Sequence, residues 1–348
     1  MERITRLLPR LLRFKAGHGF AMLIALVFVV SGVAAAPDFP SVRLFGVDYV
    51  DAHDFARRFD LTPSWTVPQK TMRLRNATTH LDFTVHDVDA WLNGLRLFLA
   101  EPVVVSAGRL FLSKNDADEL LVPILSRNAT EPRLPVKTIV IDAGHGGKDP
   151  GNQNSRLKIS EKTYTLDVAR RLERLLKAQG FKVIMTRKTD KAVELDRRAE
   201  IANRAKADLF ISIHFNGFSR SSVDGTETYV MTPRNQRSSP QAERDDKMVR
   251  TRYPANKYDR WNASLGYQIH RALVTGLKSP DRGMKRFRYS VLRSVNCPAV
   301  LVEAAFLSND AEGKKVATAA YRQRIAESIA RGVQQHAVLR SRWKPKNL

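Results

Sequence analysis

The chain of 348 residues is long enough for one large domain or two ordinary ones. Because 43% of the residues are hydrophobic, the chain can build a packed core, which excludes wholesale disorder. The formal net charge of +23 favours an anionic partner, such as nucleic acid, acidic lipid or an anionic wall polymer. The single cysteine, Cys297, excludes an intramolecular disulfide, and its place beside an apolar run favours a buried small residue over a catalytic thiol.

The first 36 residues have the pattern of a secretory signal peptide. Five basic residues precede an uncharged, mostly apolar run from Gly19 to Ala36, and three alanines before Pro37 fit a cleavage site. The alternative is an uncleaved membrane anchor, although the run is near the lower length limit for a span. If the signal is cleaved, we expect no stable membrane span.

Export would narrow the choice of anionic partner. Residues 1–36 hold five basic residues and one acidic residue, so their removal lowers the net charge only from +23 to +19. We therefore expect an exported protein of the periplasm or cell envelope, for which nucleic acid is a poor partner and the cell envelope a good one.

Residues 41–125 form a predicted small α+β domain. Short runs alternate apolar and polar residues, as half-buried strands do, and Asn93-Gly94 is typical of a hairpin turn. We expect helices at Asp51–Phe59 and Lys114–Leu125, the second capped by Asn115. The expected strands lie within 41–50, 71–76, 81–85, 95–99 and 109–113. The polar residues 126–135, with two prolines and no periodicity, predict a linker.

Residues 136–340 form a predicted α/β domain, with a mostly parallel sheet flanked by helices on both faces. The expected strands are 136–143, 181–187, 207–216, 225–233 (near an edge) and 298–306. The expected helices are 161–178, 195–206, 264–277 and 310–336. The polar segment 233–259 reads as a long insertion, and such loops are usually functional or disordered.

Polar residues gather where the strands of this sheet end, which is where open α/β sheets bind ligands. His145 follows the first strand, His214 ends the third, and Glu161 opens the first helix. Two imidazoles and a carboxylate can form a catalytic zinc set. Each histidine could instead be a polar surface residue, and Glu161 could simply favour the helix dipole. Glu303 interrupts the apolar run "VLVEAAF", where a carboxylate is costly to bury unless it is paired or used.

The glycines after the first strand have a predicted purpose of their own. Gly144, Gly146 and Gly147 would allow a sharp turn and let a bulky substrate approach His145. The other histidines of this domain, His270 and His336, lie on predicted helices and read as surface or packing residues.

Seven motifs occur in an order that resembles the type-3 class of zinc-dependent N-acetylmuramoyl-L-alanine amidases, over about residues 136–336. They are "IVIDAGHGGKDPG", "EK", "TR" with Asp190 downstream, "LDRRAEIAN", "ADLFISIHFNG", "DRGMKRFRYSVLR" and "CPAVLVEAAFLSN". The resemblance implies zinc ligands at His145, Glu161 and His214, and a catalytic acid/base at Glu303. Phe215 departs from the small residue usual in the family, and segment 233–259 replaces what in some members is a regulatory helix.

The resemblance implies hydrolysis of the amide between the lactyl group of N-acetylmuramic acid and L-alanine of the stem peptide. It also allows for a protein activator. Asp142 could orient a ligand or be structural, whereas Arg198 and Asn203 read as helix and packing positions. The rival readings are another zinc-dependent wall peptidase or deacetylase, and a non-catalytic wall-binding protein.

The small domain resembles the stalk domains first named from copper amine oxidase N-termini. "WLNGLRLFL" and "GRLFLSKNDADELL" carry this likeness. It implies an accessory or wall-associated role and gives no reason to expect copper.

Overall fold

The computed structural model describes residues 39–126, 135–239 and 246–341. The expected signal peptide and most of the expected linker therefore lie outside the described residues. Within the described ranges, no helix combines the length and the apolar character needed to cross a bilayer.

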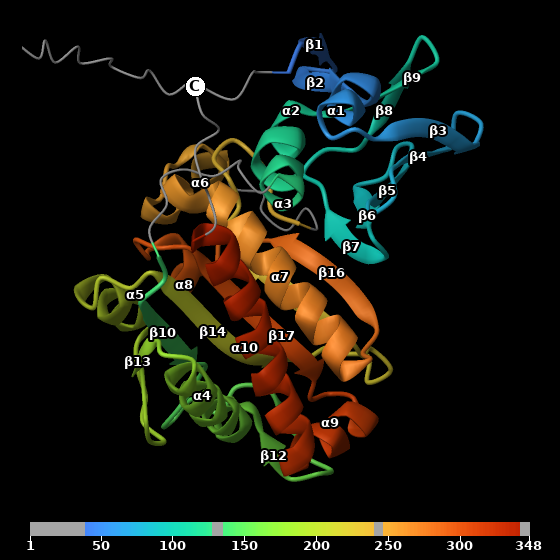
Figure 1. The fold of residues 1–348 in the computed structure, drawn as a ribbon. Coiled ribbons are helices and arrows are strands. Elements are labelled where there is room, and N and C mark those ends of the chain that lie inside the picture. The colour runs from blue at the N-terminus through green and yellow to red at the C-terminus, as the bar shows by residue number, and fades with distance from the viewer. Residues whose placement is uncertain (1–38, 127–134, 240–245, 342–348) are drawn as a thin grey trace, which may run out of the picture. The chain divides into compact units, whose positions relative to one another are not determined.

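The accessory region, residues 39–126, is mostly sheet (Figure 1). Its elements in chain order are β1 (Ser41–Leu44), β2 (Val47–Asp51), α1 (Ala52–Arg58), β3 (Thr62–Val67), β4 (Thr71–Arg75), β5 (His80–Thr84), β6 (Asp89–Leu92), β7 (Leu95–Phe98), β8 (Val104–Ser106), β9 (Arg109–Ser113), α2 (Lys114–Asp116), the π-helical turn η1 (Ala117–Leu121) and α3 (Val122–Leu125).

Both expected helices of this region are present, and the start of each follows from a capping side chain. The Asp51 carboxylate accepts from His53 N at 2.7 Å and starts α1. The second helical run begins after Ser113, whose Oγ accepts from Asp116 N at 3.0 Å. The expected cap at Asn115 was therefore wrong by two residues.

The second region, residues 135–341, alternates strands and helices. Its elements are β10 (Thr138–Ala143), β11 (Gln153–Asn154), β12 (Ile159–Ser160), α4 (Glu161–Ala178), β13 (Lys182–Met185), α5 (Leu195–Arg204), β14 (Leu209–Asn216), β15 (Thr226–Val230), α6 (Asp246–Arg250), the 3₁₀ turn η2 (Pro254–Tyr258), α7 (Asp259–Leu277), β16 (Asp281–Arg286), α8 (Ser290–Arg293), β17 (Ala299–Phe306), α9 (Asp310–Ala317) and α10 (Ala319–Ser341).

The main sheet of this region is mostly parallel, as predicted. Its strand order is β13-β10-β14-β17-β15-β16, and only the β17–β15 pair is antiparallel. Strands buried on both faces read as continuous apolar runs, which explains the composition of β10, β14 and β17.

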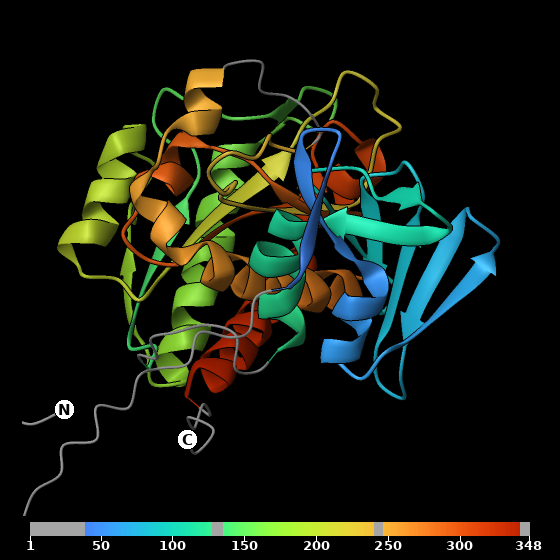
Figure 2. The same cartoon turned by 90° about the horizontal axis from the view of Figure 1, so that it is seen from above.

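Helices cover both faces of the sheet, and alternate strand residues face opposite sides (Figures 1 and 2). On one face, Ile139, Ile211 and Val302 pack into the core that α4, α7 and α10 complete. On the other face, Phe210 and Leu301 pack in the core formed with α5 and α8. By alternation, Asp142, Ser212, His214 and Glu303 belong to the α5–α8 face.

Three expectations about this region were wrong. Strand β15 is not near an edge, because it lies between β17 and β16. We did not expect β16 as a strand, because charged side chains dominate "DRGMKR". The expected C-terminal helix is two helices, α9 and α10, which separate at Thr318, a residue in extended conformation. In addition, α7 begins five residues before the expected start.

A shared sheet joins the accessory region to the α/β region. β16 pairs with β7, so β7-β6-β5-β4-β3 extend the main sheet to eleven strands among the described residues. The backbone N–H of Arg96 donates to Asp281 Oδ2 at 2.8 Å across this junction. Ala263, Tyr267 and Met284 lie in the same core as the apolar face of the accessory strands. One core therefore contains residues of both predicted domains.

A buried ion pair also crosses the junction. The Arg286 guanidinium on β16 contacts the Asp116 carboxylate on α2, and both side chains are almost fully buried. Gln236, from the insertion 233–259, accepts from Arg286 Nη1 at 2.9 Å. The insertion therefore begins as a loop held by buried polar contacts, and it continues into α6 and η2.

Candidate functional site

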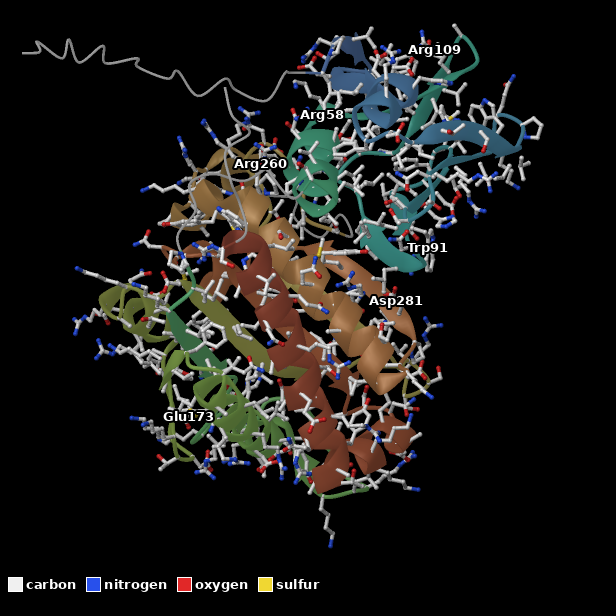
Figure 3. All side chains as sticks on the ribbon, in the orientation of Figure 1. Arg58, Trp91, Arg109, Glu173, Arg260 and Asp281 are labelled. Carbon is white, nitrogen blue, oxygen red and sulfur yellow. The ribbon has the colours of Figure 1, made fainter. Side chains whose placement is uncertain are left out.

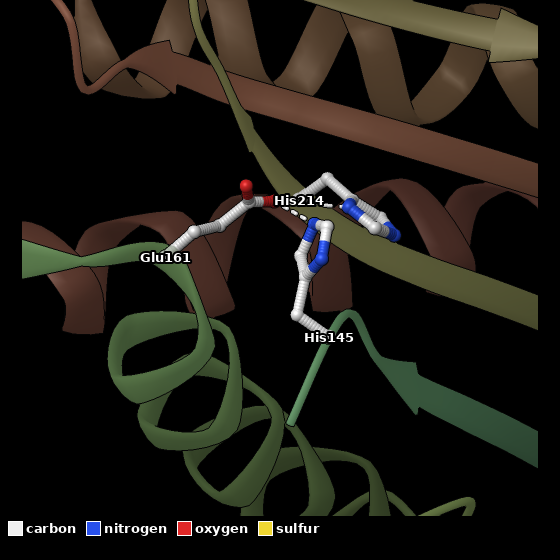
Figure 4. Close-up of side chains that lie close together, drawn as sticks. All are labelled: His145, Glu161 and His214. Carbon is white, nitrogen blue, oxygen red and sulfur yellow. Dashed lines mark hydrogen bonds and ion pairs between the residues drawn. The ribbon is translucent and has the colours of Figure 1, made fainter. Parts of the chain in front are cut away.

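Three side chains that could hold a metal converge beside the carboxyl ends of β10 and β14 (Figure 4). His145 lies two residues after β10, in the left-handed region at φ +60°, which is uncommon for a residue with a side chain. Glu161 is the first residue of α4, and His214 lies near the end of β14. The structure thus brings together the three residues predicted as ligands.

The two histidines meet at one carboxylate oxygen. Nε2 of His145 lies 3.0 Å from Glu161 Oε1, and Nδ1 of His214 lies 2.9 Å from the same oxygen. The imidazole rings stand edge to face, with their centroids 4.9 Å apart. Glu161 is almost fully buried, while both histidines keep a partly exposed edge.

This donor set fits zinc. Zinc takes imidazole nitrogen and carboxylate oxygen at about 2.0–2.2 Å, so two ligands at a tetrahedral angle lie roughly 3.3 Å apart. The nitrogen-to-oxygen distances of 2.9 and 3.0 Å are close to that value. Three protein ligands would leave a further position open toward the partly exposed edges of the histidines.

Neighbouring groups that sequence reasoning missed orient these ligands. Nδ1 of His145 donates to Asp149 Oδ2 at 2.7 Å, which directs Nε2 toward Glu161. Asn152 donates to Glu161 Oε2 from its backbone N at 2.8 Å and from Nδ2 at 3.1 Å. Phe215 N donates to Glu161 Oε1 at 3.0 Å. The only sequence signal for Asp149 was its position four residues after His145 in the same glycine-rich turn.

The glycines near the site make room for protein atoms rather than for substrate, which corrects the expectation. A Cβ on Gly144 would lie 2.3 Å from His214 Cε1, and one on Gly146 would lie 2.3 Å from the carbonyl oxygen of Lys191. A Cβ on Gly147 would lie 2.6 Å from Ala192 N. Gly144 is therefore the residue that lets the β10 turn approach the His214 ring.

Glu303 faces the same site from β17. It is the register partner of His214 on one side and of Glu227 on the other. Its Oε2 is shielded from solvent and has no hydrogen-bond partner among the described residues. A buried carboxylate oxygen without a hydrogen-bond partner destabilises the fold unless the group is protonated or takes part in the chemistry of the site.

Burial raises the pKa of Glu303 well above its ordinary value, and the negative charges of Glu161 and Glu227 raise it further. Burial also acts to raise the pKa of Glu161, but the hydrogen bonds with His145 and His214 hold it well below its usual range. The two carboxyl groups therefore prefer opposite protonation states, an arrangement typical of acid/base sites.

Glu227 is a second buried carboxylate that sequence reasoning missed. It is paired with Lys285 Nζ at 2.7 Å and Arg282 Nε at 2.9 Å, and it accepts from the Tyr229 hydroxyl at 2.6 Å. Burial acts to raise its pKa, but the charge of Lys285 and the hydrogen bonds from Lys285, Tyr229 and Arg282 together lower it. Glu227 thus remains a charged neighbour of Glu303.

These groups line a cavity of about 430 Å³. Its lining includes all four predicted site residues, the turn that follows β10, and residues of α4, α5, β14, α8 and β17. Leu195, Val291 and the ring of Tyr289 contribute apolar surface to this lining. A cavity of this size, with a few convergent polar groups, is typical of a small-molecule or substrate site.

The remaining candidates have structural roles. The Asp142 carboxylate is buried and accepts from Thr186 Oγ1, Ser212 Oγ and Arg198 Nη1 at 2.7–2.8 Å, so it contacts none of the three predicted ligands. Arg198 was read as a packing residue, but its Nη2 also donates to the carbonyl of His145 at 2.9 Å and supports the strained turn. Asn203, on α5, donates from Nδ2 to the carbonyl of Ser294 and accepts from the backbone N of Asn296, which is a packing role.

The other two histidines of the α/β region, interpreted as surface or packing residues, are buried packing residues, and Cys297 is buried as expected. His270 contacts Thr228 Oγ1 at 3.0 Å and Asp281 Oδ1 at 2.8 Å. His336 lies 3.4 Å from Ser264 Oγ through Nδ1. Cys297 is buried, and burial raises the pKa of its thiol to about 12, which disfavours a thiolate nucleophile.

Comparison with known proteins gives consistent matches. Residues 139–335 match the family model described as N-acetylmuramoyl-L-alanine amidase. The chain is 32% identical over 238 residues to the N-acetylmuramoyl-L-alanine amidase LytC of Bacillus subtilis, covering 67% of this chain and 43% of that protein. It is 30% identical over 217 residues to the amidase AmiA of Escherichia coli, covering 57% of this chain and 75% of that protein.

A solved structure of the CwlV amidase catalytic domain from Bacillus (Paenibacillus) polymyxa var. colistinus is similar to 58% of this chain and 99% of that chain, with 30% identity and a TM-score of 0.49. The chain spans about half the length of several curated relatives, between 43% and 51% for three of them. The family model covers more than half of this sequence, including His145, Glu161, His214 and Glu303. This chain belongs to the N-acetylmuramoyl-L-alanine amidase family.

Proposed function

We propose that this protein is a zinc-dependent hydrolase of peptidoglycan. It cleaves the amide between the lactyl group of N-acetylmuramic acid and L-alanine of the stem peptide. The observation that carries the proposal is a cavity lined by three possible metal ligands and by Glu303, whose Oε2 is shielded from solvent and has no hydrogen-bond partner among the described residues. Membership of the amidase family supports this choice over a wall peptidase or a deacetylase.

The ligands we propose for the metal are His145, Glu161 and His214. When bound there, zinc supplies a Lewis acid that polarises the scissile carbonyl and makes water a stronger nucleophile at neutral pH. Asp149 keeps the Nε2 lone pair of His145 directed at the site through its contact with Nδ1. Asn152 and Phe215 N hold the Glu161 carboxylate in place.

Glu303 is the proposed proton carrier. Its carboxylate accepts a proton from the attacking water and then donates that proton to the leaving nitrogen of L-alanine. The C–N bond breaks as the new C–O bond forms, which gives a lactyl carboxylic acid and a free α-amine. The raised pKa of Glu303 suits this exchange, since a carboxyl group that holds its proton near neutrality can return it to the amine.

The strongly basic composition supports a substrate with carboxylated stem peptides. Export to the cell envelope follows from the same proposal, because peptidoglycan lies outside the cytoplasm. A protein activator stays a prediction of the resemblance.

The test is product analysis on purified sacculi with the full chain. We expect intact stem peptides with a free L-alanine amino group, loss of activity on chelation and recovery with added zinc. Glu303→Gln should keep its zinc while the hydrolysis rate falls by about 10²–10⁴-fold.

Glu327→Gln is the matched control, because Glu327 is exposed on α10, which packs on the other face of the sheet. Cleaved cross-links or released acetate would contradict the amidase assignment. An unchanged rate in Glu303→Gln would remove Glu303 from the mechanism.

A further inference from the structure

The accessory strands β3 to β7 present one polar face that the catalytic chemistry does not explain. Their other face packs apolar side chains such as Leu74, Leu81 and Leu97 into the core. The strand register aligns the polar side chains of the exposed face in one row across five strands. This row, named here the Trp91 face, consists of Ser64, Arg73, Asp82, Trp91 and Arg96.

Trp91 occupies an unusual position for so large an apolar side chain. Its side chain is labelled on the accessory strands in Figure 3 and is 40% exposed. The strand register places it between Asp82 on β5 and Arg96 on β7. Tryptophan is enriched at interfaces, because most of its ring is apolar while its indole N–H is polar, so an exposed ring on this face is suited to a contact.

The arginines beside Trp91 are held in fixed positions. Arg73 makes a two-point contact with Asp82, from Nε at 2.6 Å and from Nη2 at 3.0 Å. Arg96 donates from Nε to Asp89 Oδ2 at 2.7 Å, and its guanidinium carbon lies 6.0 Å from the centre of the Trp91 ring. A guanidinium has five N–H donors, so each arginine keeps donors that these contacts do not use.

The Trp91 face lies on the same side of the continuous sheet as the catalytic groups. Glu303 is the register partner of Glu227, and the next residue of β15 on that side, Tyr229, is the register partner of Lys285 on β16. Lys285 Nζ lies 5.4 Å from the ring centre of Phe98, which shares the outer side of β7 with Arg96.

Four strand spacings separate Glu303 on β17 from Trp91 on β6, a path of about 19 Å along the sheet. Arg282 lies between them on β16 and is partly exposed. It contacts Glu227, so it adds a third paired arginine to this side of the sheet.

We propose that the Trp91 face binds the glycan strand of peptidoglycan. The proposal rests on the proposed function, because the bound polymer is the substrate of the neighbouring site. The flat indole can pack against the C–H face of a pyranose ring, and fixed arginine donors suit hydroxyl, acetamido and carboxylate oxygens. A polymer bound here would extend over the same sheet as Glu303, so the accessory region would hold the glycan from which the active site removes stem peptides.

The composition of the Trp91 face favours a glycan over a protein partner. Protein interfaces have an apolar, desolvated core, whereas here a single aromatic ring is surrounded by charge pairs and by Ser64. A sugar polymer carries polar groups around each ring, so it can contact both the indole ring and the polar side chains of this row.

The test measures binding of the full chain to soluble, peptide-free oligosaccharides of alternating N-acetylglucosamine and N-acetylmuramic acid. We expect Trp91→Ala to raise the dissociation constant by about tenfold, as loss of a central aromatic contact does. Trp91→Phe keeps a ring and should retain most of the affinity. Phe45→Ala is the matched control, because Phe45 is 86% exposed in the β1–β2 turn of the same region.

Binding and hydrolysis are measured separately, so the two proposals can fail independently. Equal affinity of wild type and Trp91→Ala for the oligosaccharides would overturn the glycan proposal even if the protein releases stem peptides. If Trp91→Ala still binds the oligosaccharides but no longer co-purifies with an envelope protein, the Trp91 face binds a protein partner, and the glycan proposal is also overturned. Trp91-dependent glycan binding without stem-peptide release would leave this proposal standing and refute the proposed function. Should Trp91→Ala not fold, Arg73→Ser replaces it, because it removes guanidinium donors of the same row and should also raise the dissociation constant; equal affinity of this variant and wild type would overturn the proposal.

Discussion

Gly144→Ala is the sharpest test of how the β10 turn builds the metal site. The added Cβ would lie 2.3, 2.6 and 2.7 Å from Cε1, Nε2 and Nδ1 of His214. Because carbon atoms pack at about 3.5–4.0 Å, the imidazole must move by more than about 1 Å. Gly144 is not among the residues with positive φ, so alanine adds no backbone strain and the change is steric alone.

A displacement of this size at a ligand should be costly. A misplacement of about 1 Å can reduce the rate by about 10²-fold, and loss of ligand orientation typically reduces metal affinity by about 10–100-fold. We expect Gly144→Ala to lose zinc and hydrolysis together. The assays are zinc content after gel filtration and stem-peptide release from sacculi.

Gly276→Ala is the matched control. Its added Cβ would also lie 2.3 Å from a side-chain atom, Ser328 Oγ, but between α7 and α10. This variant should keep its zinc and its rate even if its melting temperature changes. Normal zinc content and normal hydrolysis in Gly144→Ala would refute the reasoning that this glycine makes room for His214.

Three further predictions follow from buried polar groups. Asp149→Asn replaces the carboxylate that orients His145, and it should raise the zinc dissociation constant by about tenfold in a chelator competition. Asp116→Asn removes the carboxylate that contacts the buried Arg286 guanidinium, and it should lower the free energy of unfolding by about 3 kcal/mol in urea. Burial lowers the pKa of His336 to about 3. The unfolded chain therefore takes up a proton at His336 below about pH 6.5, whereas the folded chain does so only near pH 3. This difference leaves stability unchanged above about pH 6.5 and should lower the free energy of unfolding by about 2 kcal/mol at pH 5. His336→Leu should remove this loss of stability in acid.

Two of these predictions have a matched control, and each has a contradicting result. Asp48→Asn breaks an exposed pair with Arg43 and should change the free energy of unfolding by no more than about 1 kcal/mol. A similar small change in Asp116→Asn would mean that the buried pair is not needed. His80→Leu alters an exposed histidine, and equal pH dependence of His336→Leu and wild type would contradict the assignment to His336. Unaltered zinc affinity in Asp149→Asn would make its contact with His145 incidental.

The sequence was most informative at polar residues that interrupt or end an apolar strand. Glu303 interrupts an apolar strand, and His145 and His214 lie where buried strands end, so their positions could be predicted from periodicity and sheet topology. The structure brings His145, Glu161 and His214 within contact distance of one another.

Contacts between distant segments were the part that local patterns could not predict. β16 carries Arg282, Lys285 and Arg286, and with these charges we did not expect it as a strand. In the structure Glu227 and Asp116, from distant parts of the sequence, pair with them. Because β16 was missed, β15 was wrongly expected near an edge.

Contacts between distant segments also determine the geometry of the site itself, and local patterns could not predict them there either. The role of Gly144 depends on a ring 70 positions later in the chain, and Asn152 holds Glu161 through a loop conformation that no periodicity records. Such partners are set by tertiary packing, and a single sequence contains no direct signal for them.

The pairing of β7 with β16 has a consequence for how the chain folds. These strands are joined by contacts between residues 185 positions apart, as between Arg96 and Asp281. A chain that emerges from its N-terminus at about 5–20 residues per second would complete β7 roughly 10–40 s before β16. Throughout that interval β7 has an open edge that can pair with the wrong strand or with a second chain. The edge of β7 therefore stays unpaired until β16 has been synthesised. We expect aggregation during synthesis to be most frequent before that point.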